Sequence, residues 1–463
     1  AIKILLPENY KPGSGEKFET VYLTDGEWIM DPFSFIYKFA RDENYVPPLI
    51  LVALPNTYPD NANQRDRDFL PVHVPEPAIS GGADKFISFL REELIPYIEN
   101  KYPCNGTRSL YGHSYGGVFS AYVLFSNPGL FSTYYSTDPA YWYNNNYIPQ
   151  LASAMTTPFE TRKTLWIAGI ESTYKSMGID RMDSILKAGA IKNLSWKVVT
   201  FPNEKHNSVR LKAIYDGLKY VYSGFTDTPA EVHPSGGIAL KDKPFNIYIM
   251  NPPSEIRYTT DGTEPDITSP AVPENMMITG PAQLVVKSFS TTGKYDQVTR
   301  CIFEAGDYMT PAPAPKKIVK GGLNYSFYKG EWDVFPDFAR TKPALKGIAD
   351  STFSLSSLAG KAGFACVFEG FIEIREAGYY LFALNKTGLL KLAINGKTII
   401  ESDSEKQKES IKSFMVPLGK GYYPVRLEYL QKGGNGEALQ FLFLEPGKSN
   451  PRPVPAEILY SGK

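Results

Sequence analysis

Residues 109–121 read Ser-Leu-Tyr-Gly-His-Ser-Tyr-Gly-Gly-Val-Phe-Ser-Ala, with an apolar pair before the glycine-flanked serine and a small and apolar run after it. This order predicts a strand, a very tight turn with Ser114 at its tip, and a helix. Gly112 and Gly116 suit such a turn, because side chains two positions either side of the serine would collide. The helix would aim its first N–H groups at Ser114, where negative charge develops during acyl transfer. The stretch therefore predicts an exposed nucleophilic serine.

Length and composition limit the remaining possibilities. A chain of 463 residues is too long for one core, so two to four domains are expected. Totals of 31 Tyr, 27 Phe and 37 Pro indicate a large β component. Lys plus Arg and Asp plus Glu both total 49, which argues against nucleic acid or an anionic membrane surface as a principal partner. We find no apolar run of transmembrane length.

Termini and cysteines add two expectations. The chain starts at Ala1 without a signal-type apolar segment, so it is expected to be processed or shortened. Cys104, Cys301 and Cys366 are far apart and form no CxxC pair. Their spacing predicts neither a zinc site nor a disulfide framework.

Residues 1 to about 223 alternate between apolar strands and amphipathic helices, which predicts a mainly parallel sheet with helices on both faces. The expected strands are 20–24, 48–54, the serine strand, 164–170 and 196–201, and the expected helices are 84–102, the helix after the serine to about 126, 180–191 and 208–222. Residues 224–237 then read as a linker, 238–306 as a small antiparallel β module, 310–315 as a polyproline linker and 318–463 as a second all-β domain.

A serine hydroxyl needs a base to take its proton. His206 follows the last apolar strand, at the carboxyl ends of the sheet where active sites collect, and is the predicted base. His233 lies in the linker, and His113, beside the serine, is expected to point away from it and to serve in packing or support. Glu171 directly follows the strand before His206 and is the predicted orienting acid, with Asp180 and Asp183 as alternatives.

Two backbone N–H groups are expected to form the oxyanion hole. One is the amide of Tyr115, directly after the nucleophile, and the other is that of Glu27, in the loop after an early strand. Arg65 in the charged segment 63–68, and Tyr141 and Trp142 in the aromatic segment 134–143, are predicted to contact substrate. An ion-pair brace and core packing are the respective alternatives.

At these residues the first domain resembles the esterase D-like family of α/β-hydrolases. The resemblance rests on Tyr22–Glu27, Arg65–Pro71, Gly112–Gly117, Ser136–Trp142 and the late His206. It implies ester hydrolysis through an acyl-enzyme without a metal, as in feruloyl and acetylxylan esterases of carbohydrate esterase family 1, siderophore esterases and S-formylglutathione hydrolases. Asp is common at the acid position of that family, whereas Glu171 is predicted here.

The β regions carry two further resemblances. Ile256–Pro265 resembles the small module at the C-termini of chitobiase-type enzymes, and residues 321–445 resemble a PA14 domain. Some PA14 lectins bind sugar through calcium held by adjacent aspartates. The matching place here reads Asn385-Lys-Thr-Gly388, and a lysine there argues against calcium, so no metal is predicted.

Taken together, the chain is predicted to be a serine carboxylesterase acting on feruloyl or acetyl esters of a xylan-type polysaccharide. Both β modules are typical of enzymes that act on polysaccharides in the periplasm, at the cell surface or outside the cell. The resemblance implies no cofactor, and glycan contact through the PA14-like domain is expected. The alternatives are a siderophore esterase, a hydrolase of small acyl thioesters and a polysaccharide-binding protein with an inactive hydrolase domain.

Overall fold

The structure is a computed structural model, and it describes residues 1–462 except 9, 78, 190, 228, 253–255, 314, 351–362, 386–387, 403–410 and 433–438. Lys386 and Thr387, on which the argument against calcium depends, lie outside the described residues. The chain divides into two compact units. Unit 1 is Ala1–Asp227 with Ser290–Asp296, and unit 2 is Thr228–Phe289 with Gln297–Lys463.

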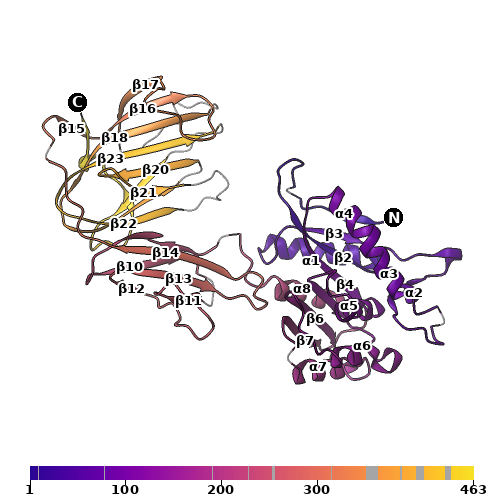
Figure 1. The fold of residues 1–463 in the computed structure, drawn as a ribbon. Helices are drawn as coiled ribbons and strands as arrows, with labels where there is room; N and C mark the ends of the chain where they lie inside the picture. Colours follow the sequence, from indigo (N-terminus) through magenta and orange to yellow (C-terminus); the bar gives the residue numbers. More distant parts are fainter. Residues whose placement is uncertain are drawn as a thin grey trace. The chain divides into compact units, whose positions relative to one another are not determined.

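Unit 1 is built on a sheet of seven described strands in the order β1-β3-β2-β4-β5-β6-β7 (Figure 1). Strand β1 runs antiparallel to β3, and every other neighbouring pair is parallel. This is an α/β-hydrolase-like esterase fold, as predicted. The strands are β1 (Lys3–Leu5), β2 (Phe18–Leu23), β3 (Leu49–Ala53), β4 (Cys104–His113), β5 (Thr133–Thr137), β6 (Lys163–Ile170) and β7 (Leu194–Phe201).

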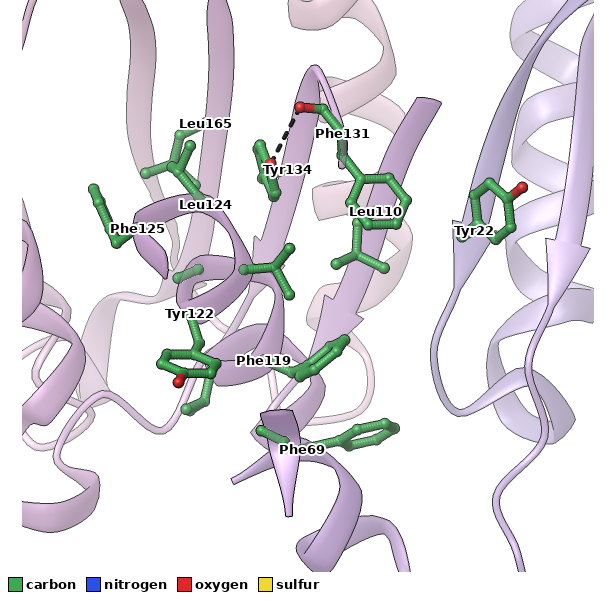
Figure 2. Close-up of a cluster of buried hydrophobic side chains, with 14 of the residues drawn as sticks. Tyr22, Phe69, Leu110, Phe119, Tyr122, Leu124, Phe125, Phe131, Tyr134 and Leu165 are labelled. Atoms are coloured by element: carbon green, nitrogen blue, oxygen red, sulfur yellow. Dashed lines mark hydrogen bonds between the residues drawn. The ribbon is translucent and has the colours of Figure 1, made fainter. Parts of the chain in front are cut away.

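Helices pack on both faces of this sheet, because successive strand residues point to opposite sides. Leu110 and Tyr134 join the core under α5, which also contains Phe119 and is drawn in Figure 2. Their neighbours Tyr111 and Tyr135 face the other way, into a second core with α1 and α8. The helical segments are α1 (Gly26–Asp42), η1 (Pro59–Asn61), α2 (Arg65–Phe69), α3 (Ala83–Phe89), η2 (Leu90–Leu94), α4 (Ile95–Lys101), α5 (Tyr115–Ser126), α6 (Tyr143–Ser153), η3 (Glu171–Thr173), α7 (Ile179–Ala188) and α8 (Val209–Val221).

Unit 2 consists almost entirely of strands, as predicted for the rest of the chain. Its sheets run β12-β10-β8, β11-β13-β14-β9-β22-β19-β24-β25 and β15-β26-β18-β23-β20-β21, with β16 and β17 beside β18. The elements are β8 (Glu231–His233), β9 (Gly236–Ala239), β10 (Pro244–Met250), β11 (Ile256–Thr259), β12 (Met276–Thr279), β13 (Ala282–Ser288), β14 (Gln297–Ala305), β15 (Ile318–Lys320), β16 (Leu323–Lys329), β17 (Leu345–Ala349), β18 (Phe364–Ile374), β19 (Gly378–Asn385), β20 (Leu389–Ile394), β21 (Lys397–Glu401), β22 (Lys412–Leu418), β23 (Gly421–Gln431), β24 (Gln440–Leu444), β25 (Arg452–Pro453), η4 (Ala456–Ile458) and β26 (Leu459–Gly462).

The predicted domain borders at 223, 238–306 and 318 differ from this division. Strand β9 pairs in parallel with both β14 and β22, so one sheet continues through both predicted β domains. The 290–296 segment belongs to unit 1, where Glu19 accepts hydrogen bonds from Lys294 Nζ (2.6 Å) and the Tyr295 hydroxyl (3.0 Å). Local sequence patterns cannot predict that a segment so distant in the sequence packs with unit 1.

Among the described residues, no helix has the length and apolar character that crossing a bilayer demands. Within the same residues, no group of three or more His, Cys, Asp or Glu side chains is arranged to hold a metal ion.

Candidate active site

Ser114 lies at the turn between β4 and α5, as the opening stretch predicts. Its backbone adopts φ 58° and ψ −119°, a sparsely populated conformation for a residue with a side chain. The Ser114 N–H donates to the Thr137 carbonyl at the end of β5 (2.9 Å). A Cβ atom at Gly112 would stand 1.8 Å from the Gly116 carbonyl oxygen, and one at Gly116 would stand 2.5 Å from Thr24 Oγ1, so close approaches require glycine at both positions. The hydrogen bond to Thr137 and the close packing at the two glycines thus stabilise a strained turn.

His206 follows β7 and shares a cavity of about 570 Å³ with Ser114. The side chain of His206 is 46% exposed, whereas that of Asp138 is 1% exposed. His206 Nδ1 lies 2.6 Å from Asp138 Oδ2. A carboxylate at this distance holds the ring with its proton on Nδ1, which leaves Nε2 free to accept a proton.

Asp138 directly follows β5, and its amide donates to the Ala168 carbonyl of β6 (2.6 Å). Its backbone has φ 39°, which turns the chain sharply at the end of the strand. This geometry corrects the predicted pairing of His206 with Glu171. Glu171 begins the short η3 segment and is exposed. The carboxylate beside His206 therefore comes from Asp138, directly after the neighbouring strand β5, and not from the residue after β6.

The two alternative acids are placed elsewhere. Asp183 lies on α7 and accepts hydrogen bonds from the Tyr174 hydroxyl (2.5 Å) and Lys187 Nζ (2.7 Å). Asp180 lies in the first turn of α7. A signal for Asp138 was present in the sequence, because it directly follows Thr133–Thr137, a stretch of Tyr and Thr residues that favour β-strands.

His113 supports the loop that carries His206. Its Nε2 lies 2.7 Å from the His206 carbonyl oxygen, and the two ring centroids are 4.4 Å apart. Burial, followed by the neighbouring His206, lowers the pKa of His113 to about 3. The neutral ring then donates its Nε2 proton to that carbonyl, which matches the predicted supporting role.

The low pKa of His113 predicts a measurable loss of stability in acid. Between its ordinary value of 6.5 and about 3, the unfolded chain binds a proton at His113 that the folded chain does not. Stability therefore falls as the pH falls through this range, by about 1.4 kcal/mol per pH unit from this group. His113→Gln is expected to remove this contribution to the slope. The slope is measured by urea unfolding at about pH 5 and about pH 7. Unfolding of this part of the chain is followed by the release of proteolytic peptides from residues 1–227. Equal slopes in the two proteins would contradict the assignment.

The predicted oxyanion donors lie at the starts of two helices. The amide of Tyr115 begins α5, directly after Ser114. In the first turn of α1 the amides of Gly26, Trp28 and Ile29 donate to backbone carbonyls. The amide of Glu27 stays a predicted donor. Its carboxylate accepts hydrogen bonds from the Tyr58 hydroxyl (2.6 Å) and Asn56 Nδ2 (3.0 Å), which outweigh burial and lower the pKa of Glu27.

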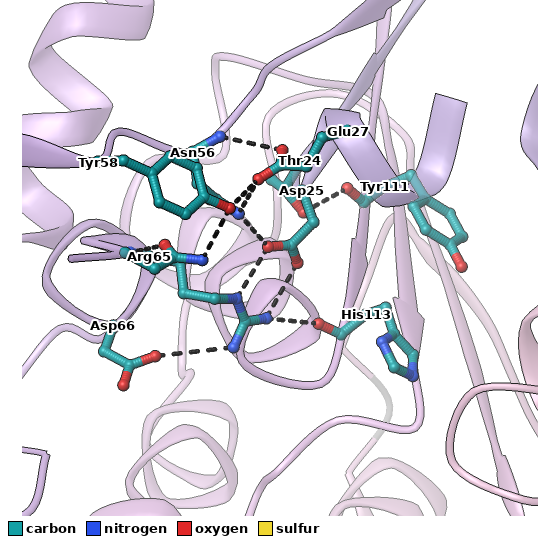
Figure 3. A network of polar contacts seen from close by, with 10 residues as sticks. Thr24, Asp25, Glu27, Asn56, Tyr58, Arg65, Asp66, Tyr111 and His113 are labelled. Carbon is teal, nitrogen blue, oxygen red and sulfur yellow. Dashed lines mark hydrogen bonds and ion pairs between the residues drawn. The ribbon is translucent and has the colours of Figure 1, made fainter. Parts of the chain in front are cut away.

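Arg65 binds Asp25, the residue directly before α1. Its Nε and Nη2 atoms bind both carboxylate oxygens of Asp25, at 2.8 and 3.0 Å (Figure 3). Burial alone would lower the pKa of Arg65, but the hydrogen bonds and charge of Asp25 raise it. The geometry is that of the ion-pair brace foreseen for segment 63–68. Direct contact of Arg65 with substrate stays a prediction.

The structure distinguishes the two aromatic residues predicted to contact substrate. Tyr141 is fully buried and its hydroxyl lies 2.8 Å from Ser136 Oγ, so the prediction that it contacts substrate is wrong. Trp142 is 47% exposed and lines the cavity beside Ser114. The ring of Tyr115 lies 6.4 Å from it, measured between centroids. The cavity thus offers an aromatic surface within reach of the serine, and substrate contact by Trp142 stays a prediction.

The site combines a strand–turn–helix that carries a strained serine with a cavity-lining histidine and a buried aspartate. This is the arrangement found in serine hydrolases with an α/β-hydrolase-like fold. Comparison with family models agrees. Residues 1–171 match the model described as "Putative esterase", and residues 320–453 match the PA14 domain. The two family matches therefore fall on separate parts of the chain.

The curated relatives match less than a third of this chain. The chain is 32% identical over 154 residues to a siderophore enterobactin esterase of Emericella nidulans, covering 29% of this chain and 50% of that protein. It is 33% identical over 151 residues to a siderophore triacetylfusarinine C esterase of Aspergillus fumigatus, covering 31% and 50%. The chain therefore spans about half the length of these relatives. A solved IroE-like serine hydrolase from Shewanella oneidensis is 28% identical with a TM-score of 0.42, covering 48% of this chain and 75% of that one.

Proposed function

We propose that this protein is a serine hydrolase of carboxylic esters, with Ser114 as nucleophile, His206 as base and Asp138 as the carboxylate that orients His206. The observation that carries the proposal is the 2.6 Å contact of His206 Nδ1 with buried Asp138, in a cavity shared with Ser114. Asp138 takes the place that the sequence assigned to Glu171.

The proposed reaction passes through an acyl-enzyme. Ser114 Oγ attacks the ester carbonyl while His206 Nε2 takes its proton. The oxyanion is held by the amides of Tyr115 and Glu27, and collapse of the intermediate expels the alcohol, which takes the proton from His206. Water then attacks the acyl-serine with His206 again as base, and Ser114 regains its proton as the acid leaves.

We propose siderophore esters as the substrate class. The support is the resemblance of residues 1–171 to esterases and the names of the two fungal relatives, both siderophore esterases. Catecholate siderophores carry flat aromatic rings, and Trp142 and Tyr115 offer aromatic surface in the cavity. The relatives favour this substrate over the carbohydrate esters expected from the sequence.

Carbohydrate esters are the second candidate. The match of residues 320–453 to a PA14 domain favours them, because the β modules are typical of polysaccharide-degrading enzymes. On either substrate, we expect the protein to work in the periplasm, at the cell surface or outside the cell. The glycan contact predicted for the PA14 domain belongs to this candidate.

A substrate panel tests both candidates. Purified full-length protein is assayed on a catecholate siderophore trilactone, methyl ferulate and acetylated xylan, and Ser114 labelling by a fluorophosphonate is followed in parallel by mass spectrometry. We expect labelling at Ser114 and the highest kcat/KM on the trilactone. A preference for ferulate or acetylated xylan would transfer the proposal to carbohydrate esters. Absence of both labelling and turnover would refute ester hydrolysis.

A further inference from the structure

We propose that Asp25 and Arg65 act as a positioning pair that holds the two predicted oxyanion donors, Glu27 and Tyr115, in register. The inference rests on the proposed function and assigns Arg65 a role in catalysis without contact to the substrate. The pair lies between the start of α1, the loop after β3 and the serine turn (Figure 3).

Asp25 fixes the first of the two donor loops. It is 1% exposed and adopts the left-handed conformation (φ 53°). Its carbonyl accepts hydrogen bonds from the amides of Trp28 and Ile29, the two residues that follow Glu27. Asn56 Nδ2 donates to the Asp25 carboxylate at 2.8 Å, in addition to the two bonds from Arg65. The carboxylate is therefore held from two directions.

Arg65 connects this loop to the serine turn. Its Nη2 donates to the carbonyl of His113, the residue before Ser114, at 3.5 Å. Its guanidinium carbon lies 5.6 Å from the centroid of the Tyr115 ring, the residue after Ser114. One planar group thus contacts Asp25 and the residues on both sides of the nucleophile.

The two donor loops also approach each other directly. A Cβ atom at Gly116 would stand 2.5 Å from Thr24 Oγ1 and 3.3 Å from Asp25 Oδ2. Thr24 in turn donates its N–H and its hydroxyl to the Tyr111 carbonyl, both at 3.1 Å. At this spacing a shift of the Asp25 loop changes the distance between the two predicted amides.

The charge of the pair gives a second reason for its role. Asp25 is a buried carboxylate near the site where the oxyanion would form, and Arg65 neutralises it. Without Arg65, the buried Asp25 carboxylate would lose the positive charge that neutralises it. Its negative charge would then disfavour the negative charge that develops on the substrate oxygen. The Arg65 side chain is 16% exposed and committed to Asp25, which favours positioning over substrate contact.

The test compares Arg65→Met, Arg65→Lys and the double variant Asp25→Asn/Arg65→Met on a neutral p-nitrophenyl ester, which offers Arg65 no anionic group. We expect Arg65→Met to lower kcat by about 100-fold with KM within about three-fold, because only the transition state needs both amides. Arg65→Lys should fall between Arg65→Met and wild type. The double variant should regain about ten-fold in kcat over Arg65→Met, because it removes the unpaired carboxylate.

Arg67→Met is the matched control, since Arg67 lies on the same helix and pairs with Asp68 at the surface. Its kcat is expected within about two-fold of wild type. Unchanged kcat in Arg65→Met, or a rise in KM confined to anionic esters, would overturn the proposal. Should Arg65→Met fail to fold by circular dichroism, wild-type kcat in Arg65→Lys would overturn it. Failure of the proposed function is distinguishable, because wild-type protein would then neither turn over esters nor react with a fluorophosphonate.

Discussion

Replacing Ser114 by Ala is expected to lower kcat for ester hydrolysis by about six orders of magnitude, with folding unchanged. The acyl-enzyme route needs an oxygen at this position, and alanine leaves the strained backbone turn with a side chain of similar size. The loss should appear on every ester that the wild-type protein hydrolyses, because the first chemical step is the same for all of them. Initial rates of purified full-length variants measure it.

Ser172→Ala is the matched control, because Ser172 lines the same cavity. It is expected to keep kcat within about three-fold of wild type and to keep the fluorophosphonate label, which Ser114→Ala should lose. Comparable turnover by Ser114→Ala and wild-type protein would remove Ser114 from the mechanism.

The sequence was sufficient where one local pattern determined the geometry. Gly112, Ser114 and Gly116 between an apolar run and a helical run define the turn without reference to any distant residue. His206 could be placed because parallel strands deliver the loops after them to one edge of the sheet. Both inferences depend on chain order alone, and the structure has these residues where the order implies.

The acid could not be obtained in the same way. Glu171 directly follows an apolar run, whereas Asp138 follows a strand of Tyr, Ser and Thr residues, so the local pattern favoured Glu171. The choice depends on how the chain turns after each strand. Asp138 turns at φ 39° with its amide bonded across to β6, whereas Glu171 enters a short exposed helical turn. These are long-range and conformational facts.

Burial explains the other differences. Tyr141 and Trp142 are adjacent aromatic residues with the same composition signal, yet one is fully buried and the other 47% exposed. In unit 1, Glu19 accepts a hydrogen bond from Lys294, which lies far along the chain. The sequence periodicity of neither segment predicts this contact. Side-chain direction at a loop and insertion from a distant segment are both set by the assembled fold.

Asp138→Asn is expected to lower kcat by about 10⁴-fold, whereas Glu171→Gln should leave it within about two-fold. Asparagine keeps the size of the side chain, but its amide nitrogen can donate to His206 Nδ1. That hydrogen bond favours the ring with its proton on Nε2, which then has no lone pair to accept the Ser114 proton. The comparison uses kcat on one ester across the pH range in which wild-type protein is active.

The pair of variants discriminates between the two carboxylates because they differ in burial and partner, and each substitution only replaces an oxygen by an amide nitrogen. Asp138 is 1% exposed and 2.6 Å from the ring, so its charge also stabilises the imidazolium formed during attack. Exposed Glu171 would act through solvent, which screens it. A large loss in Glu171→Gln with near-normal kcat in Asp138→Asn would restore the sequence-based assignment, and it would require the loop after β6 to turn back toward His206 during catalysis.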